Sequence, residues 1–155
     1  MFLYYLNYIQ IKKMRCILFI LLLLLSIQIH AQDIVGEWIS IDRETNVEKS
    51  IVEIFERNGK YHGKIVEFLE EGAEPDSACQ HCKGKMKGKK LMGFEVLRNF
   101  EKDDDEFVDG TIIDPENDKT YDAKIWVDED DSSILHLRGY VSFFYQTIEW
   151  KRARK

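Results

Sequence analysis

Apolar and polar residues alternate along short stretches of this chain, and this period of two constrains the fold more than any other feature. Residues 119–128 carry apolar side chains at every second position, and only Trp126 breaks the pattern. Residues 133–141 repeat it. Such alternation is typical of a β-strand that buries one face. We expect eight strands, because similar stretches occur at 35–41, 50–57, 60–69, 92–100, 106–113 and 145–151.

The connections between these stretches are short and rich in turn-forming residues. Asn58-Gly59 suits the positive φ angles of a tight hairpin, and residues 114–118 combine a proline with Asp and Asn. The acidic residues 101–105 and 128–132 are expected to form solvated turns. Strands joined in series by hairpins form an antiparallel meander. We therefore predict an all-β, antiparallel up-and-down β-barrel, with a β-sandwich as the alternative.

The first 31 residues differ in composition from the rest of the chain. Three basic residues precede a charge-free, leucine-rich run, and Ala31 is a small residue suited to the position before a cleavage site. This order is that of a secretory signal peptide, and residues 16–29 are fewer than the ~20 apolar residues that span a membrane. We expect residues 1–31 to be a signal peptide and residues 32–155 to be a single β-barrel domain. The mature protein is then periplasmic or secreted, without a stable membrane anchor.

Charge and motifs exclude several classes of function. Cleavage after Ala31 removes three basic residues and no acidic ones, so the net charge changes from −6 to −9. A chain this acidic is unlike proteins that bind nucleic acids through a basic surface. The sequence also lacks the G-x-S-x-G, H-E-x-x-H, P-loop and Rossmann motifs. We therefore predict no catalytic residues, no cofactor and no nucleic-acid partner.

Cys79 and Cys82 form a C-x-x-C motif, and in an exported protein a disulfide is the favoured interpretation. A redox role needs a thiolate stabilised at a helix N-terminus, which the sequence does not indicate. A metal site formed by Cys79, Cys82 and His81 is a weaker alternative, because such a site needs about four ligands. The histidines considered as further ligands are His62 and His136.

The cysteine pair lies in residues 70–90, a long stretch without a strand pattern. This stretch begins with acidic residues and ends with lysines. Long connections in compact domains are often functional, although many are plain surface loops. Its opposed charges would suit a charged protein partner.

Trp38 follows Gly36 at the start of the first expected strand. A tryptophan at this position can lie across the floor of a small antiparallel barrel, and Arg138 or Arg152 can stack on its ring. Lipocalins and their relatives close their barrels with such a Trp–Arg pair, so this arrangement resembles a lipocalin. The alternative is an ordinary buried core tryptophan.

His136, Arg138 and Tyr140 share one face of an expected strand. If this face lines the barrel interior, the three side chains form a polar patch suited to a carboxylate. If it faces outward, they are a solvated surface. The opposite face carries Leu135, Leu137 and Val141, and this favours the outward orientation.

Together the motifs resemble one family of exported bacterial proteins, domain of unknown function 2147. The matching segments are GEWISID at 36–42, KYHGKIV at 60–66, CQHCKGKMKGKKLMGFEVL at 79–97, DGTIIDPENDKTYDAKI at 109–125, LRGYV at 137–141 and Glu149-Trp150. Where the family continues into a strand containing Gly-Arg-Thr, this chain has FFYQT at 143–147, and Asp118 replaces a turn glycine. The resemblance implies a small exported β protein and supplies no catalytic residues.

These observations predict a non-enzymatic protein that binds a small, partly apolar ligand or an envelope component. The candidate ligand-binding residues are Trp38, His136, Arg138 and Tyr140. One alternative is a protein-interaction module that uses residues 70–90. Another is a metal-binding or redox role of Cys79 and Cys82.

Overall fold

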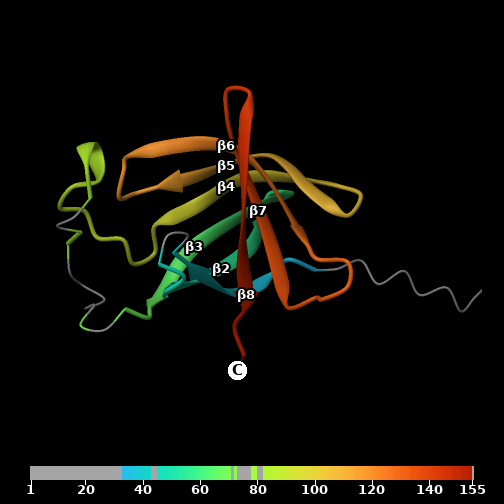
Figure 1. Cartoon of the computed structure of the whole chain (residues 1–155), viewed down its shortest axis with the longest axis horizontal. Helices are drawn as coiled ribbons and strands as arrows, with labels where there is room; N and C mark the ends of the chain where they lie inside the picture. The colour runs from blue at the N-terminus through green and yellow to red at the C-terminus, as the bar shows by residue number, and fades with distance from the viewer. Residues whose placement is uncertain (1–32, 43–44, 71, 73–77, 80–81, 155) are drawn as a thin grey trace, which may run out of the picture. The chain divides into compact units, whose positions relative to one another are not determined.

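The computed structural model describes residues 33–42, 45–70, 72, 78–79 and 82–154, all of which belong to the unit Gln32–Lys155. The predicted signal peptide lies outside these residues. The elements, shown in Figure 1, are β1 (Gly36–Ile41), β2 (Glu48–Arg57), β3 (Lys60–Phe68), η1 (Gly84–Met86), β4 (Glu95–Asp103), β5 (Glu106–Asp114), β6 (Lys119–Val127), β7 (Ile134–Val141) and β8 (Phe144–Arg152). None of the helical structure in the described part of the chain is long and apolar enough to cross a membrane.

The eight strands form a closed antiparallel barrel in which each strand pairs with its neighbour in sequence. This confirms the predicted up-and-down barrel and excludes the sandwich. The barrel closes where β1 pairs with β8, through Trp38↔Arg152 and Ile39↔Lys151. Because the strands alternate in direction, the connections after β1, β3, β5 and β7 all lie at one end of the barrel, and the other connections lie at the opposite end.

The hairpin between β2 and β3 forms as its sequence predicts. Asn58 and Gly59 both have positive φ angles, 56° and 76°, which a two-residue turn of this kind requires. The predicted acidic turn at 101–105 is shorter than expected, because β4 continues to Asp103 and only residues 104 and 105 form the turn. Backbone pairing with β5 extends this charged stretch as a strand whose side chains stay in solvent.

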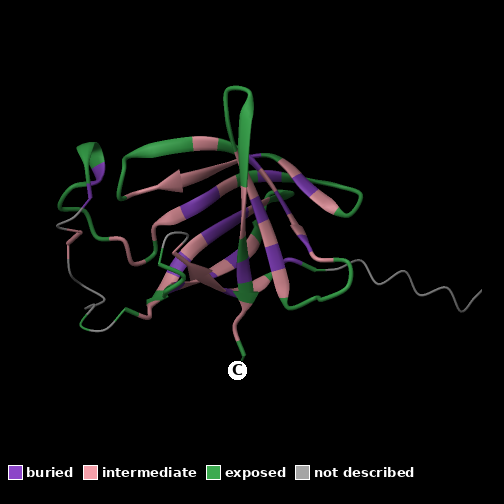
Figure 2. Ribbon diagram, viewed as in Figure 1, coloured by how far each residue is buried: buried purple, intermediate pink, exposed green. Residues whose placement is uncertain are grey.

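Burial alternates along the strands, as Figure 2 shows, and the alternate residues that point inward form the core. Trp38 and Phe100 are completely buried within it, together with Ile34 from the segment that precedes β1. Gly110 is required here, because a Cβ atom at this position would lie 2.3 Å from the Phe100 ring. The connections after β2, β4 and β6 therefore lie at an end of the barrel that is filled by side chains.

Candidate ligand-binding site

The other end of the barrel holds a cavity of about 1040 Å³. This volume is at the upper end of the ~300–1,000 Å³ that is usual for small-molecule sites. Its deep part is lined by apolar residues that point inward from five strands, namely Val52, Ile65, Val96, Leu137, Ile148 and Trp150. Gly139 also lines the cavity, and the absence of a side chain there leaves room next to Tyr121.

Polar side chains surround the mouth of the cavity. Ser40 of β1 hydrogen-bonds to Ser50 of β2, with 2.7 Å between the two hydroxyl oxygens. Beside them, Lys49 donates to the Glu116 carboxylate and lies 3.5 Å from Asp42 Oδ2. Partial burial opposes the charge of Lys49, but the hydrogen bond from its ammonium to Glu116 and the neighbouring carboxylates raise its pKa above the ordinary value. The ammonium group is therefore held in the charged form at the mouth.

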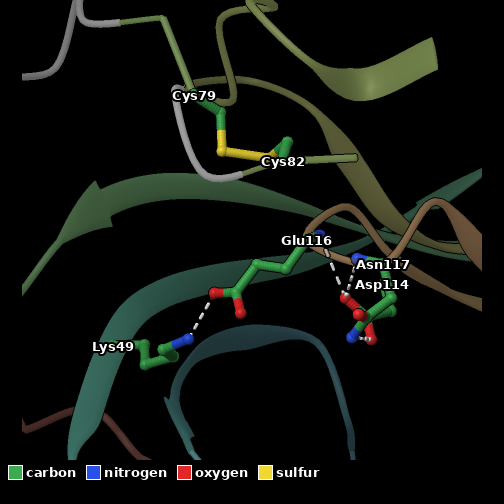
Figure 3. Close-up of a disulfide and its surroundings, with 6 residues drawn as sticks. All are labelled: Lys49, Cys79, Cys82, Asp114, Glu116 and Asn117. Atoms are coloured by element: carbon green, nitrogen blue, oxygen red, sulfur yellow. Dashed lines mark hydrogen bonds and ion pairs between the residues drawn. A yellow bond between two sulfur atoms is a disulfide. The ribbon is translucent and has the colours of Figure 1, made fainter. Parts of the chain in front are cut away.

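Glu116 belongs to the β5–β6 turn, which Asp114 holds in place. The Asp114 carboxylate accepts the backbone N–H groups of Glu116 and Asn117 at 3.0 and 3.1 Å, and also the Asn117 side-chain amide at 2.8 Å (Figure 3). This is the local bonding that makes Asp favourable before a turn. The turn thereby presents Glu116 toward Lys49 of β2.

Cys79 and Cys82 are joined by a disulfide, with their Cα atoms 5.5 Å apart, as Figure 3 shows. The long connection that contains them is fixed to the β5–β6 turn. Lys83 N–H donates to Glu116 O at 3.0 Å, and Lys85 N–H donates to an Asp118 carboxylate oxygen at 2.9 Å. Met86 of η1 is buried although its neighbours are exposed lysines. The Asp118 side chain therefore has a definite bonding role in this turn.

The closed end of the barrel contains the predicted Trp–Arg pair. The Trp38 indole N–H donates to Ile34 O at 2.8 Å, and the Arg152 guanidinium carbon lies 4.1 Å from the centre of the Trp38 ring. Of the two arginines considered from the sequence, it is therefore Arg152 that stacks on this ring. Arg152 also donates to the backbone oxygen of Asp33 at 2.8 Å, which holds the segment before β1 across the barrel end.

His136, Arg138 and Tyr140 lie on the outer face of β7, since the alternate residues Leu135 and Leu137 are buried in the core. They form part of a ladder of stacked side chains around Trp126. The His136 ring stacks on Trp126 with 5.0 Å between centroids, and the Arg138 guanidinium carbon lies 5.0 Å from the Trp126 ring centre. The interior orientation is excluded. None of these three residues, nor Trp38, lines the cavity, and a role in binding stays a prediction.

His136 is also held by a carboxylate. Its Nε2 lies 2.9 Å from Asp128 Oδ2, and this hydrogen bond is the main reason that the pKa of Asp128 is lower than usual. His136 is thus a partner of Asp128 and Trp126 in the structure.

His62, the other histidine considered as a metal ligand, is buried on the outer side of β3. Its Nδ1 lies 3.2 Å from Arg57 Nη2 and 3.6 Å from Glu95 Oε2. Burial and the charge of Arg57 lower the pKa of His62. His81 lies outside the described residues, within which no group of three or more potential ligands is placed to hold a metal ion.

Sequence reasoning missed Lys49 and Gly139. Gly139 lies in a predicted strand, at an inward position of its alternating pattern, and Lys49 lies one residue before another predicted strand. A glycine at an inward position indicates that a neighbour or a cavity takes the place of its side chain, and only the structure shows that at Gly139 it is the cavity. Lys49 gave no such signal, because its partner Glu116 lies 67 positions later in the chain.

Comparison with known proteins places the chain in a family. A family model described as an uncharacterised protein conserved in bacteria, DUF2147, matches residues 36–152. The chain belongs to the DUF2147 family. Among solved structures, this DUF2147 chain is similar to protein HP1028 from the human pathogen Helicobacter pylori, which is described as belonging to the lipocalin family. The TM-score is 0.64 at 18% identity, and the match covers 79% of this chain and 84% of HP1028. The similarity shows a lipocalin-like fold, and no curated protein matches the chain.

Proposed function

We propose that this protein binds a small, partly apolar ligand in the cavity of its barrel, without catalysing a reaction. The observation that carries the proposal is the cavity itself, which has an apolar floor and a polar mouth. Such a site buries the apolar part of a ligand and orients its polar part. The lipocalin-like fold and the family membership are compatible with this role.

We further propose that binding takes place outside the cytoplasm. The signal-peptide pattern of residues 1–31 supports export, and the Cys79–Cys82 disulfide is typical of an oxidising compartment. A DUF2147 protein that captures an apolar molecule there would carry it through an aqueous space. The described residues supply no constellation that favours an enzymatic, redox or metal-binding role over this one.

A plug in the cavity tests the proposal. Gly139→Phe adds a ring inside the cavity and removes no existing side chain. The backbone can accept the change, because a Cβ atom at this position makes only an ordinary 3.7 Å contact with Tyr121. Gly139→Leu is a smaller plug, for use if the larger one reduces stability. Lys151→Phe adds the same ring to the outer face of β8 and is the matched control.

The probe is N-phenyl-1-naphthylamine, a neutral apolar dye whose fluorescence increases in apolar surroundings. We expect the wild-type protein and Lys151→Phe to bind about one dye per chain. The Gly139 variants should bind it at least about tenfold more weakly at unchanged thermal stability, since filling the space removes the apolar contacts. Equal binding by wild type and both plugged variants, or no binding by wild type, would refute the proposal.

A further inference from the structure

The hairpin between β7 and β8 exposes an unusual amount of apolar surface. Phe143 at its tip is 97% exposed and Phe144 is 78% exposed, while Val141 and Tyr145 are more than half exposed. Within the described part of the chain, the other exposed large apolar residues are Tyr140, which pairs with Tyr145 in the same hairpin, and Val35 and Val47. Figure 2 shows this hairpin standing out from the barrel and exposed along its tip. Exposed apolar surface gathered in one place indicates an interaction site.

The size of this surface favours a bilayer over a folded protein partner. Each aromatic side chain can bury about 150–250 Å², so the four rings of the hairpin, in proportion to their exposed fractions, supply about 400–700 Å², less than the ~800 Å² that each side of a stable protein interface buries. The tip is also a projection of two paired strands. Insertion among lipid chains needs neither a large flat area nor a complementary shape.

Positive charge lies at the same end of the barrel. The connection after β3 and the turn after β7 share this end, and the first of these contains exposed lysines at positions 83, 85, 87, 89 and 90. The bonds from Lys83 and Lys85 to the β5–β6 turn fix this lysine segment (residues 83–90) in place. Lysines that share one end of the molecule with an exposed apolar tip can attract anionic lipid headgroups.

The acidic residues nearby offset only part of this charge. Glu116 is paired with Lys49, while Asp118 keeps its charge because it accepts a neutral backbone N–H, and five exposed lysines stand against it in the lysine segment. The remaining negative charge of the domain is spread over the barrel, and beyond a Debye length of about 8 Å it is screened at physiological salt.

We propose that the open end of the barrel docks on a lipid bilayer that contains anionic lipids, with the β7–β8 tip inserted and the lysine segment against the headgroups. Val141 and Gln146 of this hairpin also line the cavity. Docking therefore brings the mouth of the cavity to the membrane surface, where an apolar ligand can pass between the two without crossing water. Vesicle binding itself does not depend on the proposed ligand, so the two proposals can fail separately.

Co-sedimentation with vesicles tests the docking. The vesicles contain equal parts of phosphatidylcholine and phosphatidylglycerol, and vesicles of phosphatidylcholine alone are the control. The variant Phe143→Ser/Phe144→Ser removes the two phenylalanine side chains of the tip. The control variant Val47→Ser removes an exposed apolar side chain at the same end of the barrel. All variants carry the same residues 1–31 or the same processed N-terminus, so any contribution of that segment cancels in the comparison.

A second pair of variants tests the charge. Lys85→Gln/Lys87→Gln removes two charges from the lysine segment, and Lys102→Gln/Lys151→Gln removes two from the closed end of the barrel. Each lysine near an anionic surface contributes up to about fivefold in affinity. The first pair should therefore weaken binding about tenfold or more, and the second pair should change it little.

We expect wild-type protein to bind the anionic vesicles, with at least about tenfold weaker binding after loss of the two phenylalanines and no effect of Val47→Ser. Phe143→Trp should give a blue-shifted emission on addition of these vesicles. Thermal unfolding of each variant checks that the barrel is intact. Absence of vesicle binding, equal binding by the Phe143→Ser/Phe144→Ser variant, or self-association that depends on the two phenylalanines would overturn the proposal.

Discussion

Removal of the Trp38 side chain is the strongest test of how the barrel is closed. Trp38 is completely buried at the end where β1 meets β8. Truncation of large buried aromatic residues costs about 3–5 kcal/mol. We therefore expect Trp38→Ala to lower the free energy of unfolding by ~3–5 kcal/mol.

Two further changes divide this loss into its parts. Trp38→Phe keeps most of the apolar surface but deprives the Ile34 carbonyl of the indole donor at 2.8 Å, which should cost about 1–3 kcal/mol. The Arg152 guanidinium stacked at 4.1 Å should add a coupling of about 0.5–2 kcal/mol. Because Arg152 also bonds to backbone oxygens, only a double-mutant cycle of Trp38→Ala with Arg152→Met isolates this coupling.

The assay is urea unfolding followed by far-ultraviolet circular dichroism, since tryptophan fluorescence would change with the mutation itself. Trp126→Ala is the matched control, because that indole lies on the outer face and stacks on polar and charged side chains. We expect it to cost about 1 kcal/mol. A loss below about 1 kcal/mol for Trp38→Ala at an unchanged m-value would refute the role of this residue in closure. A coupling near zero would refute the stacking.

Three other predictions concern the disulfide, pH and export. Replacing Cys79 and Cys82 by serine should leave the barrel folded and cost less than the ~3 kcal/mol of a 15-residue loop, and intact mass with and without reductant should show the gain of two hydrogens in the wild type. The pKa of His62 lies below its ordinary 6.5 in the folded state, mainly through burial, so the unfolded chain takes up a proton first as the pH falls. The contribution of His62 to stability should be at its full value above pH 6.5 and decline below it, and His62→Gln should remove that part of the decline in urea titrations at several pH values. N-terminal sequencing of the exported protein should begin at Gln32, and recovery of the uncleaved chain in an integral membrane fraction would contradict this.

The strands could be predicted from the sequence because each alternates residues between a buried and an exposed face. Seven of the eight strand pairings join strands that are neighbours in sequence. The order of the strands could therefore also be predicted, from turn sequences such as Asn58-Gly59. Trp126 broke the alternation for a reason that only the structure shows. It lies outside the barrel and is covered by His136 and Arg138, so its position needs no interior space.

The candidate site could be predicted only in part. The sequence predicted which residues point inward, but not whether their side chains fill the barrel, because that depends on how strands of different tilt and register bring them together. Gly139 and Gly110 show this, since both stand in strands, yet Gly110 is filled by Phe100 and Gly139 borders open space. The ion pair of Lys49 with Glu116 likewise depends on strand register.

The short seam between β1 and β8 has a consequence for how this protein acquires its cavity. The other seven strand pairs join neighbours in sequence, whereas the bond from Arg152 to the Asp33 carbonyl joins residues 119 positions apart. Contacts between distant parts of a chain form late in folding, because the entropy of closing a long loop is lost before they are made. We expect the meander to assemble first and the seam to close last. The cavity then exists only after the final folding step, and a bound ligand would slow the reopening of that seam.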